Sequence, residues 1–167
     1  VTGIAKSLGG SGDPSPVTAF GVYMGMKASV KEQFNKNSLE GLKISVQGLG
    51  HVGTHLVDYL TKDGAKVYVT DIDKNRVDVI VDKYKCIAIE ATDILNKEVD
   101  IYAPCALGAT VNKTSIPKLN CKIIAGAANN VLENPLSDSE LLVKKGILYA
   151  PDYVINAGGL INVANEL

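Results

Sequence analysis

The chain has 167 residues, a formal net charge of −1, 46% hydrophobic residues and 21% charged residues. This size and composition are typical of one globular domain with its own core. The sequence has neither a basic run nor an apolar run long enough to cross a bilayer, so it predicts no nucleic-acid partner and no membrane partner. Three cysteines without CxxC or zinc-type spacing favour reduced thiols in a cytoplasmic compartment: Cys86, Cys105 and Cys121.

The two ends of the sequence bear on domain organisation. Val1 opens the chain without an initiator methionine, and residues 165–167 close it inside a predicted helix. We therefore expect residues 1–167 to form a single domain of a longer, two-domain protein.

A helix is expected first, followed by alternating strands and helices. Pro16 suits a first helical turn, and Val22, Met26 and Val30 form an apolar stripe at i, i+4, i+8, which predicts a helix over 17–34. Strands are expected at 43–47, 66–70, 86–89, 99–103, 121–125 and 147–150, and helices at 51–62, 73–84, 137–145 and 158–166. The connection 104–120 is less regular, and Pro117 limits any helix there.

The predicted strands are nearly continuous apolar runs. Such runs are typical of parallel strands that crossover helices bury on both faces. The sequence therefore predicts an α/β fold with a doubly wound, mostly parallel, Rossmann-like sheet and an N-terminal leading helix.

The segment 48–53 (GLGHVG) lies between the first predicted strand and the next helix. In this context a G-x-G-x-x-G motif binds a dinucleotide. Gly48 permits a tight turn, Gly50 lets the backbone approach a diphosphate, and Gly53 lets the helix pack close to the strand. The helix start adds unpaired N–H groups and the positive end of its dipole. The alternative is a glycine-rich turn in an α/β fold without a ligand.

An acid at the end of the second strand bears on the choice of dinucleotide. Asp71 follows Gly48 by 71 − 48 = 23 residues, near the spacing at which an acid binds the adenosine ribose diol. This acid repels a 2′-phosphate, and Asp73 adds a second negative charge, so the sequence predicts NAD rather than NADP. Arg76 either reaches a phosphate or faces solvent from the next helix.

Asparagines follow two later strands in small or Gly-rich loops. An amide both donates and accepts hydrogen bonds, as recognition of a nicotinamide carboxamide requires, whereas a single Asn more often caps a turn. Beside a dinucleotide fingerprint, the three together favour binding: Asn129, Asn130 and Asn156.

Four segments resemble the Glu/Leu/Phe/Val dehydrogenase family, and within it the leucine dehydrogenases, in order along essentially the whole chain: 12–19 (GDPSPVTA), 46–53 (VQGLGHVG), 103–108 (APCALG) and 150–159 (APDYVINAGG). The resemblance implies NAD-dependent oxidative deamination of an L-amino acid to a 2-oxo acid and ammonium, and the reverse reaction. It also implies homo-oligomers assembled largely through an N-terminal domain that these residues do not include.

The resemblance also implies roles for individual residues. Thr18 would lie by the nicotinamide carboxamide, and Asn130 and Asn156 would approach the nicotinamide ribose or amide. The diphosphate would be held by Gly48, Leu49, Gly50, His51, Val52 and Gly53, the adenosine ribose by Asp71, and the cleft would be lined by Cys105, Ala106 and Leu107. Leu160 and Val163 would form the substrate side-chain pocket, although their i, i+3 spacing alone indicates plain core.

No segment of this chain matches the family's catalytic lysine and aspartate. Lys27 is expected on a solvated helix face, because a lysine base needs desolvation or a cationic neighbour. We therefore expect this chain to bind NAD without turnover. The alternative is a non-catalytic nucleotide-binding or assembly module. Phenylalanine, valine and glutamate remain competing substrates, with the apolar pocket pair arguing against glutamate.

Two further features have simpler explanations. His51 and His55 have the i, i+4 spacing of a metal-binding pair, but no nearby ligand completes a shell, so no metal is predicted. Cys105 lies by the expected cleft without a His–acid pair, so we expect a small buried hydrophobe rather than a nucleophile.

Overall fold

The computed structural model describes residue 7 and residues 9–164. These residues form a six-stranded sheet with the order β3-β2-β1-β4-β5-β6, in which every neighbouring pair is parallel. The strands are β1 (Lys43–Gln47), β2 (Lys66–Thr70), β3 (Ile87–Ala88), β4 (Ile101–Pro104), β5 (Ile123–Ile124) and β6 (Leu148–Tyr149). This is the doubly wound order of Rossmann folds, so the predicted fold class is confirmed.

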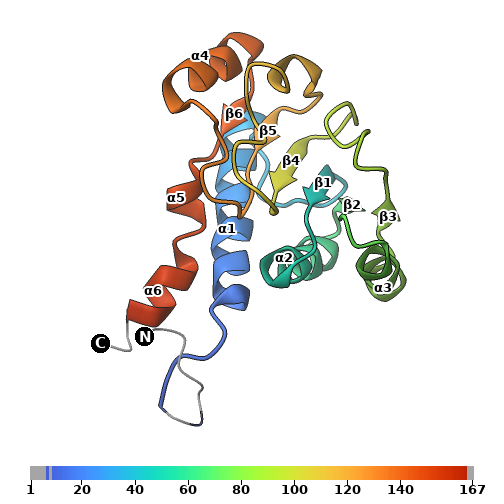
Figure 1. The fold of residues 1–167 in the computed structure, drawn as a ribbon, viewed down its shortest axis with the longest axis vertical. Helices are drawn as coiled ribbons and strands as arrows, with labels where there is room; N and C mark the ends of the chain where they lie inside the picture. Colours follow the sequence, from blue (N-terminus) through green and yellow to red (C-terminus); the bar gives the residue numbers. More distant parts are fainter. Residues whose placement is uncertain (1–6, 8, 165–167) are drawn as a thin grey trace.

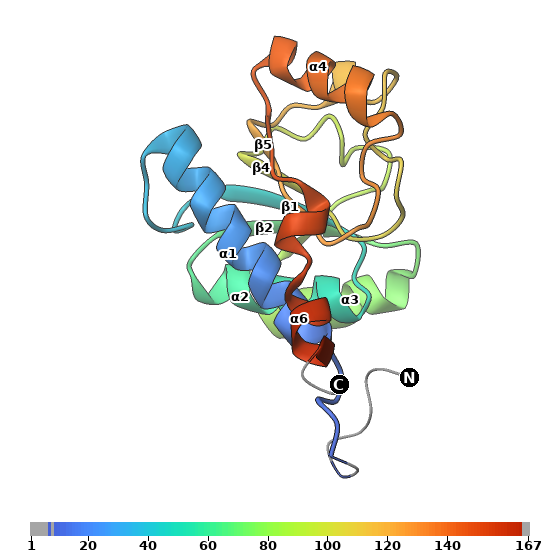
Figure 2. The same ribbon diagram turned by 90° about the vertical axis from the view of Figure 1, so that its left-hand side faces the viewer.

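Helices occupy both faces of this sheet (Figures 1 and 2). One core packs the sheet against α1, α2 and α3 through side chains such as Met26, Leu56 and Val77. A second core packs the other face against η2 and α4 through Ile116 and Leu142. The helices are α1 (Ser15–Phe34), α2 (His51–Lys62), α3 (Lys74–Tyr84), the 3₁₀ turn η2 (Ile116–Lys118), α4 (Pro135–Lys145), α5 (Asp152–Ile155) and α6 (Gly158–Ala164).

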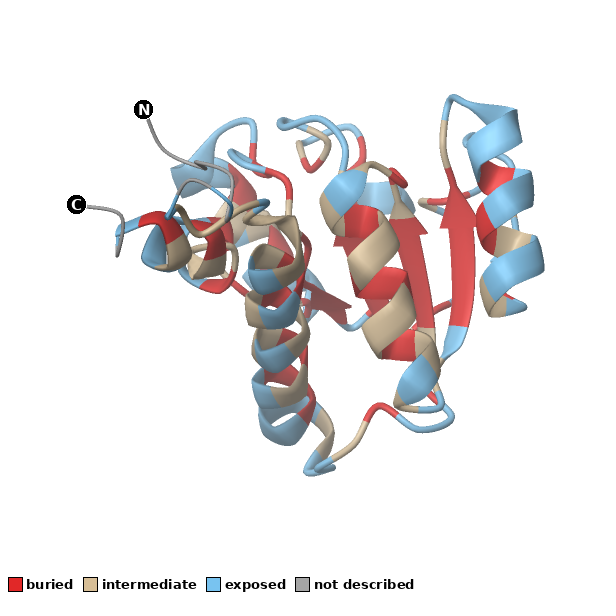
Figure 3. Cartoon of the chain, turned by 90° about the horizontal axis from the view of Figure 1, so that it is seen from below, coloured by how far each residue is buried: buried red, intermediate tan, exposed pale blue. Residues whose placement is uncertain are grey.

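The central strands are the most buried part of the molecule, whereas the outer faces of the helices are exposed (Figure 3). Burial on both faces was expected of every strand, and that expectation is wrong at the two edges. Both residues of β3 are exposed and both residues of β6 are half-buried. Each of these strands pairs with one neighbour only, so part of its surface stays open.

Local capping explains where several helices begin. α3 begins at Lys74 rather than at residue 73, because the Asp73 side chain accepts hydrogen bonds from the Asn75 and Arg76 backbone amides (3.1 and 3.3 Å). α4 begins two residues earlier than predicted, at Pro135, since Asn134 caps it through the Ser137 amide.

The carboxyl-terminal region departs furthest from the predicted elements. Residues 152–155 form the short helix α5 in a segment expected to be a loop. The next helix begins at Gly158 as predicted, and its last expected residues, 165 and 166, lie outside the described residues. Residues 1–6, 8 and 165–167 also lie outside them, including the chain ends considered above. Within the described part of the chain, no helix has the length and apolar character needed to cross a bilayer.

Candidate dinucleotide-binding site

The glycine loop joins β1 to α2 at the point where the strand order reverses. Gly48 has φ +99°, and a Cβ there would lie 2.8 Å from the Ala106 backbone nitrogen. A Cβ on Gly53 would lie 2.1 Å from the Gly48 carbonyl oxygen, so α2 packs directly on the turn. The glycines therefore permit the tight turn and the close helix approach that the motif predicts.

Gly50 occupies the N-cap position of α2 and leaves open space in front of the helix start. As a glycine it offers no side chain to bond the first amides, and the first turn of α2 contains no acid. A Cβ on Gly50 would meet nothing within 4 Å among the described residues. The first N–H groups of a helix have no intrahelical acceptor. These amides, with the positive end of the helix dipole, are suited to bind an anion.

Asp71 lies directly after β2 and is held by two backbone amides. Its Oδ2 accepts a hydrogen bond from Leu49 N at 2.6 Å, and its Oδ1 accepts one from Asp73 N at 2.9 Å. The side chain is 7% exposed. Burial alone would raise the pKa of this carboxyl, but the two amides and the Arg76 guanidinium outweigh it and lower the pKa below its usual value. Asp71 is therefore ionised at neutral pH.

The glycine loop and Asp71 border a pocket of about 410 Å³. Ile72, 100% exposed, and Leu107, 78% exposed, offer apolar surfaces from the loops after β2 and β4. The pocket lining unites six residues predicted from the sequence with further residues around them: Gln47, Gly48, Gly50, Thr70, Asp71, Ile72, Arg76, Ala91, Cys105, Ala106, Leu107 and Thr110.

Several pocket residues were not foreseen. Gln47 precedes Gly48 at the carboxyl end of β1, a position that could have singled it out, and its Oε1 accepts a hydrogen bond from the Tyr102 hydroxyl. Thr110 lies in the irregular 104–120 segment, where no periodicity indicates burial. Its Oγ1 is buried in the pocket wall, close to the Tyr102 hydroxyl.

Leu49 differs from its expected position. Its side chain is 1% exposed and belongs to the core, and its amide is already bonded to Asp71. The Leu49 backbone amide therefore holds the Asp71 carboxylate in position. His51 is exposed, with its Nδ1 3.7 Å from Asp13 Oδ2, and Val52 is half-buried against the core.

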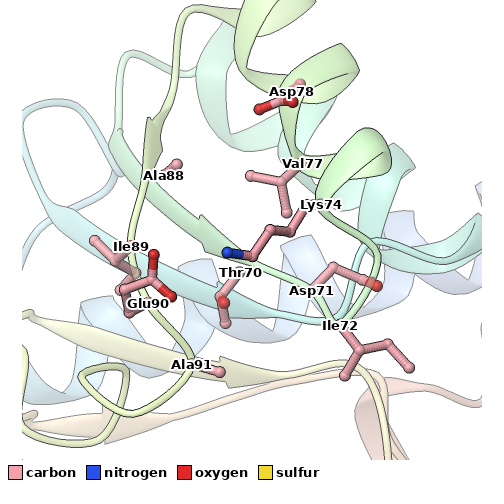
Figure 4. A pocket seen from close by; sticks show the side chains of 10 residues that line it. All are labelled: Thr70, Asp71, Ile72, Lys74, Val77, Asp78, Ala88, Ile89, Glu90 and Ala91. Carbon is pink, nitrogen blue, oxygen red and sulfur yellow. The ribbon is translucent and has the colours of Figure 1, made fainter.

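A second hollow, of about 500 Å³, lies between α3 and the segment after β3 (Figure 4). Lys74 extends over it, whereas the Asp71 carboxylate points away from it. Asp71 and Ile72 thus line both hollows, and of these two the 410 Å³ pocket includes the glycine loop.

Close packing of α6 on the start of α1 places Thr18 beside Gly159, where a Cβ would lie 2.3 Å from Thr18 Oγ1. The Thr18 hydroxyl donates to the Pro14 carbonyl at 3.0 Å and keeps its lone pairs as acceptors.

Two of the three asparagines bond to each other. Asn156 Nδ2 donates to Asn129 Oδ1 at 2.7 Å and so links the loops after β5 and β6. Asn130 is exposed with φ +51°, a conformation that also suits the turn-forming alternative.

Leu160 and Val163 do not share an environment, although they lie one turn apart on α6. Leu160 is 72% exposed and Val163 is 9% exposed. Val163 therefore packs inside the domain, whereas Leu160 projects from it.

The other candidate groups are held in inert positions. Burial raises the pKa of the Cys105 thiol to about 11, which disfavours the nucleophilic thiolate at neutral pH. Lys27 was expected on a solvated face, but its Nζ donates to the Tyr23 hydroxyl at 3.3 Å and lies 3.7 Å from Asp63 Oδ2. These partners raise the pKa of Lys27, the opposite of what a base needs. The described residues contain no group of three His, Cys, Asp or Glu side chains that could hold a metal ion.

Comparison with known proteins identifies the family. The model of the glutamate/leucine/phenylalanine/valine dehydrogenases matches residues 9–77 and 68–167. The chain belongs to this family. Leucine dehydrogenase from Bacillus cereus is 56% identical over 167 residues, which are 100% of this chain and 45% of that protein. This member of the dehydrogenase family thus spans about half the length of the curated relatives it matches.

Solved structures agree with this assignment. The crystal structure of L-tryptophan dehydrogenase from Nostoc punctiforme matches with a TM-score of 0.90 and 48% identity, over 92% of this chain and 46% of that chain. A hetero-hexameric glutamate dehydrogenase from Thermus thermophilus matches with a TM-score of 0.79 at 23% identity, over 99% of this chain and 42% of that chain, and shows the fold alone. The relatives are amino-acid dehydrogenases, which makes this chain part of an oxidoreductase family.

Proposed function

We propose that this chain is the NAD-binding domain of an L-amino-acid dehydrogenase that catalyses reversible oxidative deamination to a 2-oxo acid and ammonium. The proposal rests on the ionised Asp71, which accepts a hydrogen bond from the Leu49 amide at 2.6 Å and lines the same 410 Å³ pocket as the open helix start at Gly50. In a member of this family, that pairing of acid and anion-binding turn suits a dinucleotide.

The residues present are suited to NAD along the whole pocket. The α2 amides after Gly50 would hold the diphosphate, and Asp71 would accept hydrogen bonds from the ribose hydroxyls. Ile72 and Leu107 would cover the faces of the adenine. A diphosphate could reach these amides without a backbone movement, because the space beside Gly50 is open.

The nicotinamide would lie toward the ends of β5 and β6. NAD supplies the hydride acceptor when bound. Thr18 would accept a hydrogen bond from the carboxamide, and the Asn156–Asn129 pair would fix the amide that faces the nicotinamide ribose. The contribution of this chain is to position the ring, while the proton transfers belong to groups outside it.

We infer an apolar, branched-chain substrate, as in leucine. Leu160 and Val163 offer no cation for a second carboxylate, which disfavours glutamate. The strong exposure of Leu160 suits a pocket that a second, N-terminal domain completes. That domain would carry the catalytic lysine and aspartate, so the present chain would bind NAD without turning over substrate.

The full-length protein would be a cytoplasmic homo-oligomer, assembled largely through the N-terminal domain. The cytoplasmic assignment is supported by three unpaired cysteines, of which two are buried. The partners would be the amino acid and its 2-oxo acid.

Calorimetric titration of the chain with NADH tests the proposal. We expect saturable binding that Asp71→Ser weakens by at least about tenfold, since two ribose hydrogen bonds to a charged group are lost. Asp78→Ser is the matched control, because Asp78 lies on α3 outside the glycine-loop pocket. The site would be rejected if the wild type showed no detectable NADH binding, or if Asp71→Ser and Asp78→Ser had equal NADH affinities. A panel of amino acids with the full-length protein then identifies the substrate.

A further inference from the structure

Arg76 lies in the first turn of α3, beside the acid that should select NAD. Its Nη1 is 3.6 Å from Asp71 Oδ2, and its Nη2 is 3.7 Å from Asp73 Oδ2. The Arg76 side chain is 46% exposed, whereas that of Asp71 is 7% exposed. The acid is therefore fixed in place, and the guanidinium lies at the edge of the pocket.

The guanidinium keeps its hydrogen-bonding capacity. Both distances are longer than direct hydrogen bonds, and in the described part of the chain no acceptor is bonded to the Arg76 side chain. A guanidinium has five N–H donors in a planar fork that matches a phosphate bidentately. Because half-exposed ion pairs are weak, this group can exchange its carboxylate neighbours for a stronger anion at little cost.

Arg76 also lies between two hollows. One is the 410 Å³ pocket with Asp71, and the other, of about 400 Å³, is lined by Gly50, His51 and His55 together with Leu49, Thr54 and Arg76. A substituent on the adenosine ribose that extends past Asp71 on this side meets the guanidinium.

The negative charge at this point is partly compensated. Asp71 and Asp73 contribute two negative charges, and Arg76 contributes one positive charge within 3.7 Å of both. An uncompensated acid would repel a ribose 2′-phosphate, but here both Asp71 oxygens accept amide hydrogen bonds and a cation lies 3.6 Å away. The repulsion is thus reduced at the position where the phosphate would enter.

We propose that Arg76 is a specificity-determining residue that binds a ribose 2′-phosphate, so that the site accepts NADP as well as NAD. This inference rests on the proposed dinucleotide function. In the NADP complex, the guanidinium turns from Asp71 and Asp73 to the phosphate, and the carboxylate stays on the Leu49 and Asp73 amides. In the NAD complex, Arg76 stays beside the two acids.

Paired calorimetric titrations of the chain with NADH and NADPH test this role. We expect measurable binding of NADPH to the wild type. Arg76→Gln should raise the ratio of the NADPH Kd to the NADH Kd by at least about tenfold, because a charge-assisted bidentate contact is lost. Lys74→Gln, which removes the same charge two residues earlier, should change this ratio by less than about threefold. Thermal unfolding verifies that both variants are folded.

The outcomes separate the two proposals. Absence of NADH binding by the wild type rejects the dinucleotide function itself. Normal NADH binding without detectable NADPH binding, or an equal change of both affinities in Arg76→Gln, overturns the role of Arg76, since a residue that only braces Asp71 would affect both cofactors alike. An equal ratio change in both variants also overturns it, because it indicates general electrostatics.

Discussion

The Asp71 carboxylate both stabilises the glycine loop and lines the candidate pocket. It holds the glycine loop through Leu49 N, and it turns its remaining lone pairs toward the pocket. The sequence predicted this acid from its position at a strand end, but it could not predict the Leu49 hydrogen bond, which depends on the curvature of the loop between residues 48 and 50.

The lowered pKa of Asp71 predicts a pH-dependent contribution to stability. A carboxyl whose folded-state pKa lies below the ordinary 3.8 stabilises the fold above that pH, and the contribution is lost as the pH falls through the folded-state pKa. The difference in free energy of unfolding between wild type and Asp71→Asn should therefore be constant in neutral solution and shrink below pH 3.8. Urea unfolding at several pH values measures it. A difference that grows toward acid would contradict the assigned sign.

The cysteines predict a second residue-scale result. Burial raises the pKa of Cys105 to about 11 and that of Cys121 to about 12, and it also raises the pKa of Cys86. At pH 8 the three thiols should react slowly with a disulfide reagent in the native chain and rapidly in denaturant. Fast labelling of Cys105 in the folded chain would show that its environment is not apolar.

At the scale of elements, patterns with a clear period were predicted well. The bounds of β1, α2 and β2 agree with those expected, because each element combines strong local propensity with one consistent buried face. β3, β5 and β6 are only two residues long, although apolar runs predicted four or five. An apolar run indicates that a segment is buried. The length of a strand also depends on its pairing with a neighbouring strand, which cannot be predicted from one segment alone.

The contact between α1 and α5 gives an element-scale prediction. A Cβ on Gly25 would lie 2.4 Å from Ile155 Cγ2. Gly25→Ala should lower the free energy of unfolding by about 1–3 kcal/mol through overpacking. In an Ile155→Ala background the same change should cost less, because the nearest obstructing atom, Ile155 Cγ2, is gone. Denaturant unfolding of the wild type, the two single variants and the double variant measures this double-mutant cycle. Additive effects would mean that the two helices do not meet at this point.

At the scale of the whole molecule, large apolar side chains are exposed on helices that adjoin one another in Figures 1 and 2: Phe20 and Met24 on α1, and Leu160 and Ile161 on α6. Sequence periodicity places such residues on helices but cannot distinguish an exposed apolar face from a buried one. The family resemblance paired Leu160 and Val163 in one pocket, and their i, i+3 spacing alone indicated core, whereas the fold separates them by exposure.

Exposure predicts which apolar residues stabilise this domain. Leu160→Ser, at 72% exposure, should change the free energy of unfolding by less than about 0.5 kcal/mol. Leu60→Ala, at a residue with 0% exposure, should cost about 2–5 kcal/mol. Both values come from urea unfolding of the chain. A large loss in Leu160→Ser would show that this side chain is packed within the domain and is unavailable to a substrate pocket.

The site as a whole was predictable where a motif fixes the backbone. Gly48, Gly50, Asp71 and residues 105–107 line one pocket, because parallel strands bring their carboxyl ends to one edge of the sheet. Ala91 and Thr110 reach the same pocket from irregular segments, whose course depends on tertiary packing rather than on local pattern.

A crystal structure of the chain with NADH tests the central claim most directly. We expect the diphosphate on the amides after Gly50 and the adenosine ribose hydroxyls within hydrogen-bonding distance of the Asp71 carboxylate. A nucleotide bound elsewhere, or an Asp71 that faces away from the ribose, would contradict it.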